Sequence, residues 1–205
     1  MSTTPVRSLP ATLYWSGFAA LAMLMLVTRF HHFGDALHLP DASMAIFLCG
    51  GLLLAASEQG PRVHGAFFTL AALAGVIDWV AISGAGVSDF CVTPAYACLL
   101  PAYAVLWYGA RAFARWQTMT LARLPLAGGV ALLLVALSFS ISNGSFYWLG
   151  GRSVPGGLAD FAAQWWQWAP SFMGTAMAYI AAALLAHALW LLVARPRPTH
   201  HYTGV

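Results

Sequence analysis

Six separate apolar stretches constrain this chain more than any other feature of its sequence. Each runs for 15 to 23 residues, and the charged residues fall almost entirely between them. A helix needs about 20 predominantly apolar residues to span a bilayer. Only 7% of the residues are charged and 60% are hydrophobic, whereas about a quarter of the residues of a soluble domain are charged.

The sequence therefore predicts an all-α, polytopic membrane protein in which residues 1–205 form one transmembrane domain, a bundle of six helices in the lipid bilayer. No small-residue cleavage site follows the first stretch, so we expect a retained span rather than a removed signal peptide. The predicted spans are 12–28, 43–57, 65–83, 92–110, 124–141 and 171–193.

The arginines predict how the bundle is oriented. All nine basic residues are arginine, and seven of them fall on one side of the membrane when the N-terminus is placed in the cytoplasm. The other side receives only Arg29 and Arg152. Cytoplasmic loops are enriched in arginine and lysine, so we expect both termini to be cytoplasmic. The arginines form no basic stripe, so nothing indicates nucleic acid as a partner.

The residues whose side chains could bind a ligand or take part in catalysis lie mostly on the predicted outer side. The three outer connections carry three of the seven histidines, four of the six acidic residues and one of the three cysteines. We therefore expect a site that is open to the outside. The connections cover residues 29–41, 84–91 and 143–168.

The last outer connection is the longest. We predict that residues 143–170 form a long extracytoplasmic loop, rich in tryptophan and glycine, that can act as a lid over the site. Arg152 lies inside it and can either pair with Asp160 or bind an anionic group of a ligand.

Asp78 is the acidic residue inside a predicted span, within "AGVIDWVAIS". A charged side chain at the centre of a bilayer costs about 2.5–3.5 kcal/mol on insertion scales, so such residues usually face a polar cavity. The alternative is a structural hydrogen bond to a neighbouring helix. Both interpretations fit the sequence.

Cys91 opens the fourth predicted span, two residues after Asp89. A helix N-terminus favours the thiolate, which is the form that binds metals and attacks electrophiles; the alternative is a cysteine that only packs at the interface. Tyr96 and Tyr103 are two helical turns apart and share one face. Tyr96 either faces a cavity or belongs to the interfacial aromatic belt. The odd cysteine count and the lack of C-x-x-C indicate neither a zinc ribbon nor a disulfide framework.

Histidines cluster in the first outer connection, "HHFGDALH". His31, His32 and His38, with Asp35, are ligand types that a divalent metal accepts. Their spacing matches no zinc signature, so solvated loop histidines are the simpler interpretation.

The stretch "TRFHHFGDALHLPDASMAIFLCGG", together with "IDWVA" and "DFCVTPAYACLLPAYAVLW", resembles the BtuM family. These small bacterial membrane proteins are proposed to take up cobalamin and are related to the substrate-binding S components of energy-coupling factor transporters. The resemblance implies a bacterial inner-membrane location, cobalamin as the transported ligand and Cys91 as the cobalt ligand. It also implies that Asp78 and Tyr96 line the cavity, with a contribution from a histidine of the first outer loop (His31, His32 or His38) and from Arg152.

The implied chemistry suits a thiolate, which is a soft and strongly donating ligand for cobalt. Cys91 would replace the lower base of the vitamin, and its donation would promote loss of the upper cyanide. Docking to an energy-coupling factor module is in question, because the small-residue pattern used for it is reduced to Ser16 and Ala20.

Two other classes of function stay open. One is a haem- or metal-dependent membrane oxidoreductase, for which His187 is the only histidine well inside a predicted span. The other is an assembly protein without a ligand.

Overall fold

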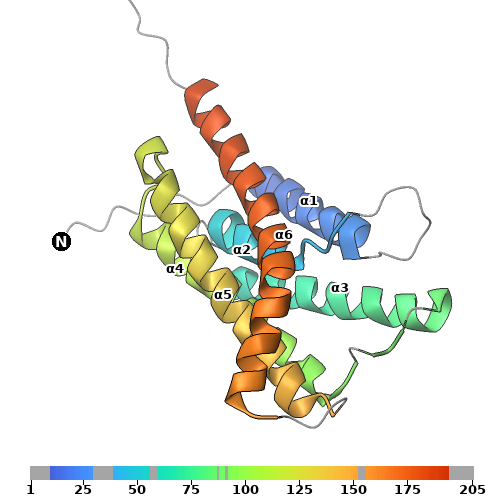
Figure 1. Ribbon diagram of the computed structural model, residues 1–205. Helices are drawn as coiled ribbons and strands as arrows, with labels where there is room; N and C mark the ends of the chain where they lie inside the picture. The colour runs from blue at the N-terminus through green and yellow to red at the C-terminus, as the bar shows by residue number, and fades with distance from the viewer. Residues whose placement is uncertain are drawn as a thin grey trace, which may run out of the picture.

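The described part of the chain is mostly helical. The computed structural model describes residues 10–29, 39–55, 60–86, 88–90, 92–151 and 156–193, and no strand occurs among them. Two short 3-10 helices (η2 and η3) and one π-helix (η1) join six α-helices (Figure 1). In chain order the elements are α1 (Ala11–Arg29), α2 (Ser43–Gly50), η1 (Gly51–Ala55), α3 (Pro61–Ala85), η2 (Pro94–Cys98), α4 (Leu99–Trp116), η3 (Leu121–Arg123), α5 (Leu124–Leu149) and α6 (Leu158–Val193).

Five helical segments are long and apolar enough to cross a membrane, which confirms the prediction of an all-α, multi-pass membrane protein. They are α1, α3, η2 with α4, η3 with α5, and α6. The second predicted span differs: α2 and η1 together cover only residues 43–55. At 1.5 Å per residue this segment is about 20 Å long, shorter than the hydrocarbon core of about 30 Å. A sixth crossing and the cytoplasmic position of the termini stay predictions.

The short helix α2 lies at the centre of the bundle. It contacts α1, α3, α4, α5 and α6, and seven of its eight residues are buried. A helix that is apolar on all sides needs such an enclosed position. Its last residue, Gly50, lies against α4, where an added Cβ would come within 2.2 Å of the Trp107 ring. Phe47 stacks on the ring of Tyr103 with centroids 4.2 Å apart.

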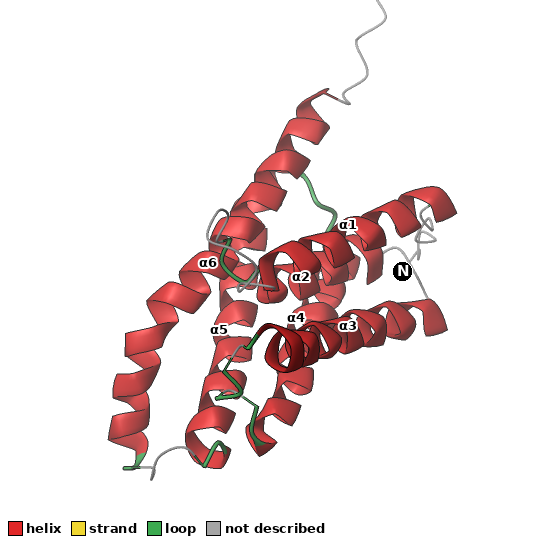
Figure 2. Cartoon of the chain, turned by 90° about the vertical axis from the view of Figure 1, so that its right-hand side faces the viewer, coloured by secondary structure: helices red, strands yellow, loops and turns green. Residues whose placement is uncertain are grey.

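Contacts at the helix ends define the relative direction of α1 and α3. At one end, the Tyr14 hydroxyl donates to the carbonyl of Arg62 over 3.3 Å. At the other end, Arg29 pairs with Asp78, so α1 and α3 run parallel. Figures 1 and 2 show these two helices projecting together to one side of the pair formed by α5 and α6. We call the end of the bundle that holds Arg29 and Asp78 the Arg29 end.

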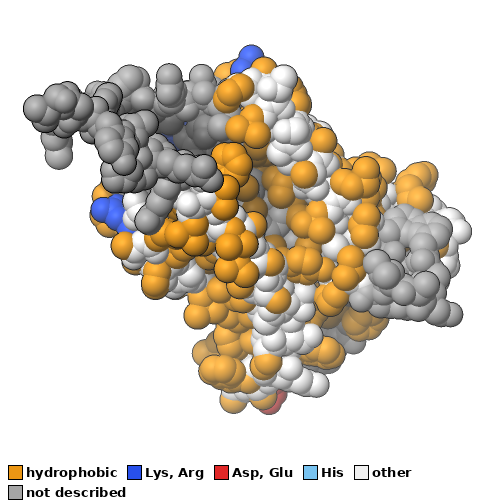
Figure 3. Space-filling view, turned by 90° about the horizontal axis from the view of Figure 1, so that it is seen from above, with side chains coloured by type: hydrophobic (Ala, Val, Ile, Leu, Met, Phe, Trp, Pro, Cys, Tyr) orange, Lys and Arg blue, Asp and Glu red, His pale blue; other side chains and the backbone are white. Residues whose placement is uncertain are grey.

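The surface of the molecule is apolar, as a lipid environment requires. Large side chains such as Trp15 (60% exposed), Trp79 (70%) and Leu185 (62%) project outward. In Figure 3 hydrophobic side chains spread over the visible face, and the few charged ones appear at its edges.

The loop predicted over residues 143–170 is mostly helix in the structure. Helix α5 continues to Leu149 and α6 already begins at Leu158, so the connection covers residues 150–157. Tyr147 fixes the end of this connection: its hydroxyl accepts from the Gly156 amide (2.9 Å) and donates to the Gly157 carbonyl (3.2 Å). Trp165 packs between the two helices instead, since it donates from Nε1 to Ser140 Oγ at 3.0 Å. The extent predicted for the loop is corrected by this finding, and Arg152 lies outside the described residues.

Candidate functional site at the Arg29 end

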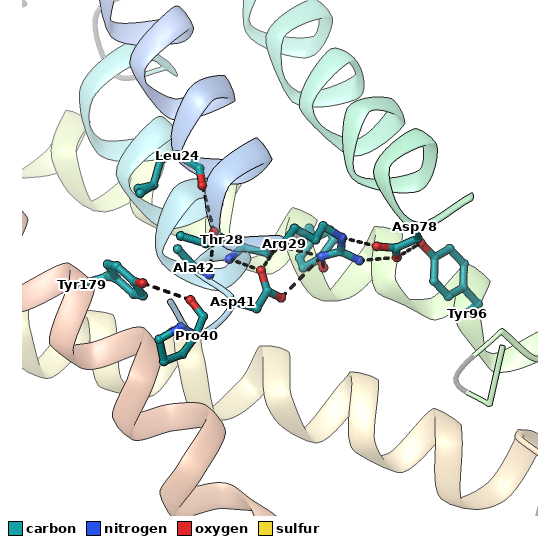
Figure 4. Close-up of polar contacts among 11 residues, drawn as sticks. Leu24, Thr28, Arg29, Pro40, Asp41, Ala42, Asp78, Tyr96 and Tyr179 are labelled. Carbon is teal, nitrogen blue, oxygen red and sulfur yellow. Dashed lines mark hydrogen bonds and ion pairs between the residues drawn. The ribbon is translucent and has the colours of Figure 1, made fainter. Parts of the chain in front are cut away.

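An ion pair between Arg29 and Asp78 forms the centre of the site. Arg29 is the last residue of α1, and Asp78 lies in the last two turns of α3. The guanidinium binds the carboxylate through two hydrogen bonds, from Nε to Oδ1 at 2.7 Å and from Nη2 to Oδ2 at 2.6 Å (Figure 4). The side chains are only 9% and 23% exposed, respectively. Bidentate arginine–carboxylate pairs are among the stronger polar contacts in proteins and fix the relative orientation of their partners.

The remaining terminal nitrogen of Arg29, Nη1, reaches two further helices. It donates to Ser43 Oγ at the start of α2 (2.7 Å) and to the Tyr103 hydroxyl on α4 (3.0 Å). It also lies 3.5 Å from an oxygen of Asp41, whose side chain is 39% exposed. One guanidinium therefore connects α1, α2, α3 and α4.

Tyr96 completes the coordination of Asp78. Its hydroxyl donates to Asp78 Oδ2 over 2.5 Å, so this carboxylate accepts three hydrogen bonds. Tyr96 lies in η2, where the Pro94–Cys98 segment forms a 3-10 helix before α4 begins, and its amide donates to the carbonyl of Thr93 (2.9 Å). Both Tyr96 and Tyr103 contact the Arg29–Asp78 pair, as expected for residues on one face.

The start of α2 is anchored at the same place. Asp41 Oδ1 accepts from the amide of Ser43 (3.0 Å) and from its hydroxyl (2.6 Å), so the first amide of α2 has a hydrogen-bond partner. The amide of Ala42 donates to Thr28 Oγ1 on α1 (3.3 Å). Tyr179 on α6 donates to the carbonyl of Pro40 (3.0 Å), as Figure 4 shows. This end of the bundle is therefore held by specific polar contacts as well as by packing.

The sequence left two interpretations of Asp78 open: it faces a polar cavity, or it makes a structural hydrogen bond to a neighbouring helix. The structure shows hydrogen bonds of the second kind for Asp78. Its oxygens are occupied by Arg29 and Tyr96. A buried charge is tolerated when it is paired and hydrogen-bonded, and Asp78 meets both conditions. With Arg29 and Asp41, the group carries one positive and two negative formal charges, so it holds an excess of negative charge.

The structure brings together two of the residues predicted to form the site, Asp78 and Tyr96. Cys91, His31, His32 and Arg152 lie outside the described residues, as does His38. The described residues next to Cys91 are at the Arg29 end: the Val92 amide donates to the Asp89 carbonyl in a turn (2.8 Å). Among the residues that the structure describes, no group of three or more histidine, cysteine or acidic side chains is placed to hold a metal ion.

Arg29 is the residue that the sequence interpretation missed, because it was taken only as a sign of topology. A signal was present: an acid inside a span needs a partner, and Arg29 is one of only two arginines on the predicted outer side. Combining those two observations would have suggested the pair.

A small cavity of about 40 Å³ lies at the opposite end of the bundle, lined among others by Cys49, Leu184 and His187. The Nε2 atom of His187 is buried there without a hydrogen-bond partner in the described part of the chain. Ligand pockets usually measure 300–1,000 Å³, so this cavity suits one or two water molecules rather than a haem.

Comparison with known proteins assigns no family, because no family model matches the chain and no curated protein matches it.

Proposed function

We propose that this chain is a corrinoid-binding membrane transporter that captures cobalamin at the Arg29 end, with Cys91 as the ligand of cobalt. One observation supports this proposal most directly. Asp78 and Tyr96, which the resemblance to the BtuM family pairs with Cys91, are 18 residues apart in the chain and their side chains meet at 2.5 Å. A pattern that is dispersed in sequence and compact in space is typical of a binding site.

Each residue of the proposed site has a role that suits its chemistry. Cys91 donates its sulfur to cobalt in place of the lower base, since a thiolate is a soft and strong donor. Tyr96, held by Asp78, presents its ring to the corrin. A histidine of the first outer connection (His31, His32 or His38) completes the site, and Arg152 binds an anionic group of the ligand.

Cysteine ligation also provides a step of chemistry on cyanocobalamin. The Cys91 thiolate donates an electron pair to cobalt on the face opposite cyanide and weakens the cobalt–carbon bond. Cyanide leaves with the electron pair of that bond and takes a proton from water, and cobalt stays in the +3 state. Cyanide retained on the bound cobalt would contradict this step.

The proposed location is the bacterial inner membrane, with the Arg29 end facing outward and both termini in the cytoplasm. We propose that the protein acts without an energy-coupling factor module. The surface of α1 supports this view, because the small-residue pair expected at a docking face is reduced to Ser16 and Ala20, both of which are exposed.

The proposal is tested by the absorption spectrum of protein purified from cells grown with cyanocobalamin. We expect a co-purifying corrinoid with a sulfur-ligated spectrum in the parent, and a lost or unshifted spectrum in Cys91→Ala. Cys98→Ala is the matched control, because Cys98 is a free, half-buried cysteine seven residues away, and we expect it to behave as the parent does.

One observation favours a second candidate, an assembly protein without a ligand. Arg29 and Tyr96 already satisfy Asp78, so the charge inside the membrane needs no ligand to explain it. A parent protein that carries no corrinoid after growth with the vitamin would support this candidate and refute transport of cobalamin.

A further inference from the structure

Two polar side-chain atoms near the proposed site are buried without a partner. Thr93 Oγ1 and Asn143 Oδ1 make no hydrogen bond within the described part of the chain. Nearly all buried polar groups in folded proteins are hydrogen-bonded, so each exception calls for an explanation. Leaving such an atom unpaired costs its full desolvation penalty.

Thr93 immediately precedes η2 and Asn143 lies on α5, and η2 packs against α5. The rings of Phe90 and Phe146 are in contact there, with centroids 5.7 Å apart. Thr93 follows Phe90 by three residues, and Asn143 precedes Phe146 by three residues along α5. The two unpaired atoms therefore lie on segments that pack against each other, and the Thr93 carbonyl accepts from the amide of Tyr96 (2.9 Å).

Asn143 lies in an unusually polar part of a membrane helix, "SFSISNGS" at residues 138–145. Two serine hydroxyls in this part donate hydrogen bonds to backbone carbonyls of their own helix. Ser142 donates to the carbonyl of Phe139 (3.1 Å) and Ser145 to that of Ser142 (2.8 Å). Such local bonds satisfy a hydroxyl inside a helix. The buried oxygen of Asn143 has no bond of this kind, so its capacity to accept a hydrogen bond is unused within the described part of the chain.

We infer that Thr93 and Asn143 are further ligand-binding residues, which hydrogen-bond uncharged polar groups on the periphery of the ligand. This inference rests on the proposed function. The rim of a corrinoid carries primary amides, each of which donates and accepts hydrogen bonds. A threonine hydroxyl and an asparagine side chain match that chemistry because each can also donate and accept.

The test compares two near-isosteric variants, Thr93→Val and Asn143→Leu, in the full-length protein. Without ligand, we expect the melting temperature to stay the same or to rise, because replacing an unpaired buried polar atom by an apolar group removes a penalty. With cyanocobalamin, we expect each variant to bind at least tenfold more weakly. A residue with a purely structural role would instead lower the melting temperature and leave the affinity unchanged, and that result would overturn the inference.

Ser142→Ala is the matched control, since it removes a neighbouring hydroxyl that is already satisfied within α5. We expect its affinity for cyanocobalamin to equal that of the parent. The two proposals fail in different ways. If the parent binds the vitamin through Cys91 and both variants bind it equally well, this inference alone is refuted. If the parent binds no corrinoid, the proposed function is refuted and this inference with it.

Discussion

The burial of Arg29 and Asp78 as a pair predicts how much the free energy of unfolding falls when one partner is removed. In Arg29→Met, Asp78 loses both hydrogen bonds from the guanidinium and keeps only the one from Tyr96. Removing one member of a buried ion pair typically costs about 3–5 kcal/mol, because the other charge is left uncompensated. We therefore expect the free energy of unfolding to fall by about 4 kcal/mol in this variant.

Asp78→Asn is the complementary change. It keeps the shape of the side chain and leaves the positive charge of Arg29 with only the more distant Asp41 at 3.5 Å. We expect a loss of about 2–3 kcal/mol, in the range for hydrogen bonds to charged groups and unpaired charges. If the two effects were independent, the double variant would lose about 6–7 kcal/mol.

The double variant, Arg29→Met with Asp78→Asn, is expected to lose only about 3–4 kcal/mol, because the one charge left behind is on Asp41, which is 39% exposed and still accepts two hydrogen bonds from Ser43. The coupling energy is therefore about 3 kcal/mol, at the top of the range for residues in contact. Equilibrium unfolding of the purified protein in mixed detergent micelles measures all four free energies. Strictly additive losses would refute the reasoning. Arg123→Met, at an exposed arginine in η3, is the control and should change stability by less than about 0.5 kcal/mol.

Two further predictions concern stability at single positions. Gly50→Ala places a Cβ 2.2 Å from the Trp107 ring, so we expect thermal unfolding to show a loss of stability of about 1–3 kcal/mol from overpacking. The control is Gly75→Ala, where a Cβ would meet nothing within 4 Å; this variant should be neutral or stabilised by up to about 1 kcal/mol. Equal effects at the two glycines would contradict the close approach of α2 to α4. Tyr96→Phe removes the hydroxyl that donates to Asp78 and should lower the free energy of unfolding by about 1.5–3 kcal/mol, whereas unchanged stability in the same assay would show that this hydrogen bond contributes nothing net.

The sequence predicted the helices well where hydropathy alone decides them. The first predicted span, 12–28, matches α1 (Ala11–Arg29) to within one residue at each end. The start of α6 was placed 13 residues too late, at 171 instead of Leu158. Tryptophan and polar residues at an interface lower the hydropathy of a segment without ending its helix, so a window average stops short.

The site was predicted in part. The meeting of Asp78 and Tyr96 was expected from the resemblance, while the contribution of Arg29 was not. Its role depends on how the ends of four helices come together, and such long-range packing leaves no periodic trace in the sequence. The sequence gives no indication of the unpaired atoms of Thr93 and Asn143, because a residue type does not reveal whether its partner is present.

The shortness of the segment from α2 to η1 has a consequence for how the protein enters the membrane. A segment about 20 Å long does not match the hydrocarbon thickness by itself, so it is a poor insertion signal alone. Its bonds to the end of α1, through Arg29 with Ser43 and Thr28 with Ala42, make the two helices a hairpin that can be inserted as one unit. Asp78 on α3 follows this hairpin in the chain, so we expect its counter-charge to be in place when α3 is synthesised. The order of the helices along the chain therefore limits the time during which an unpaired acid is exposed to lipid.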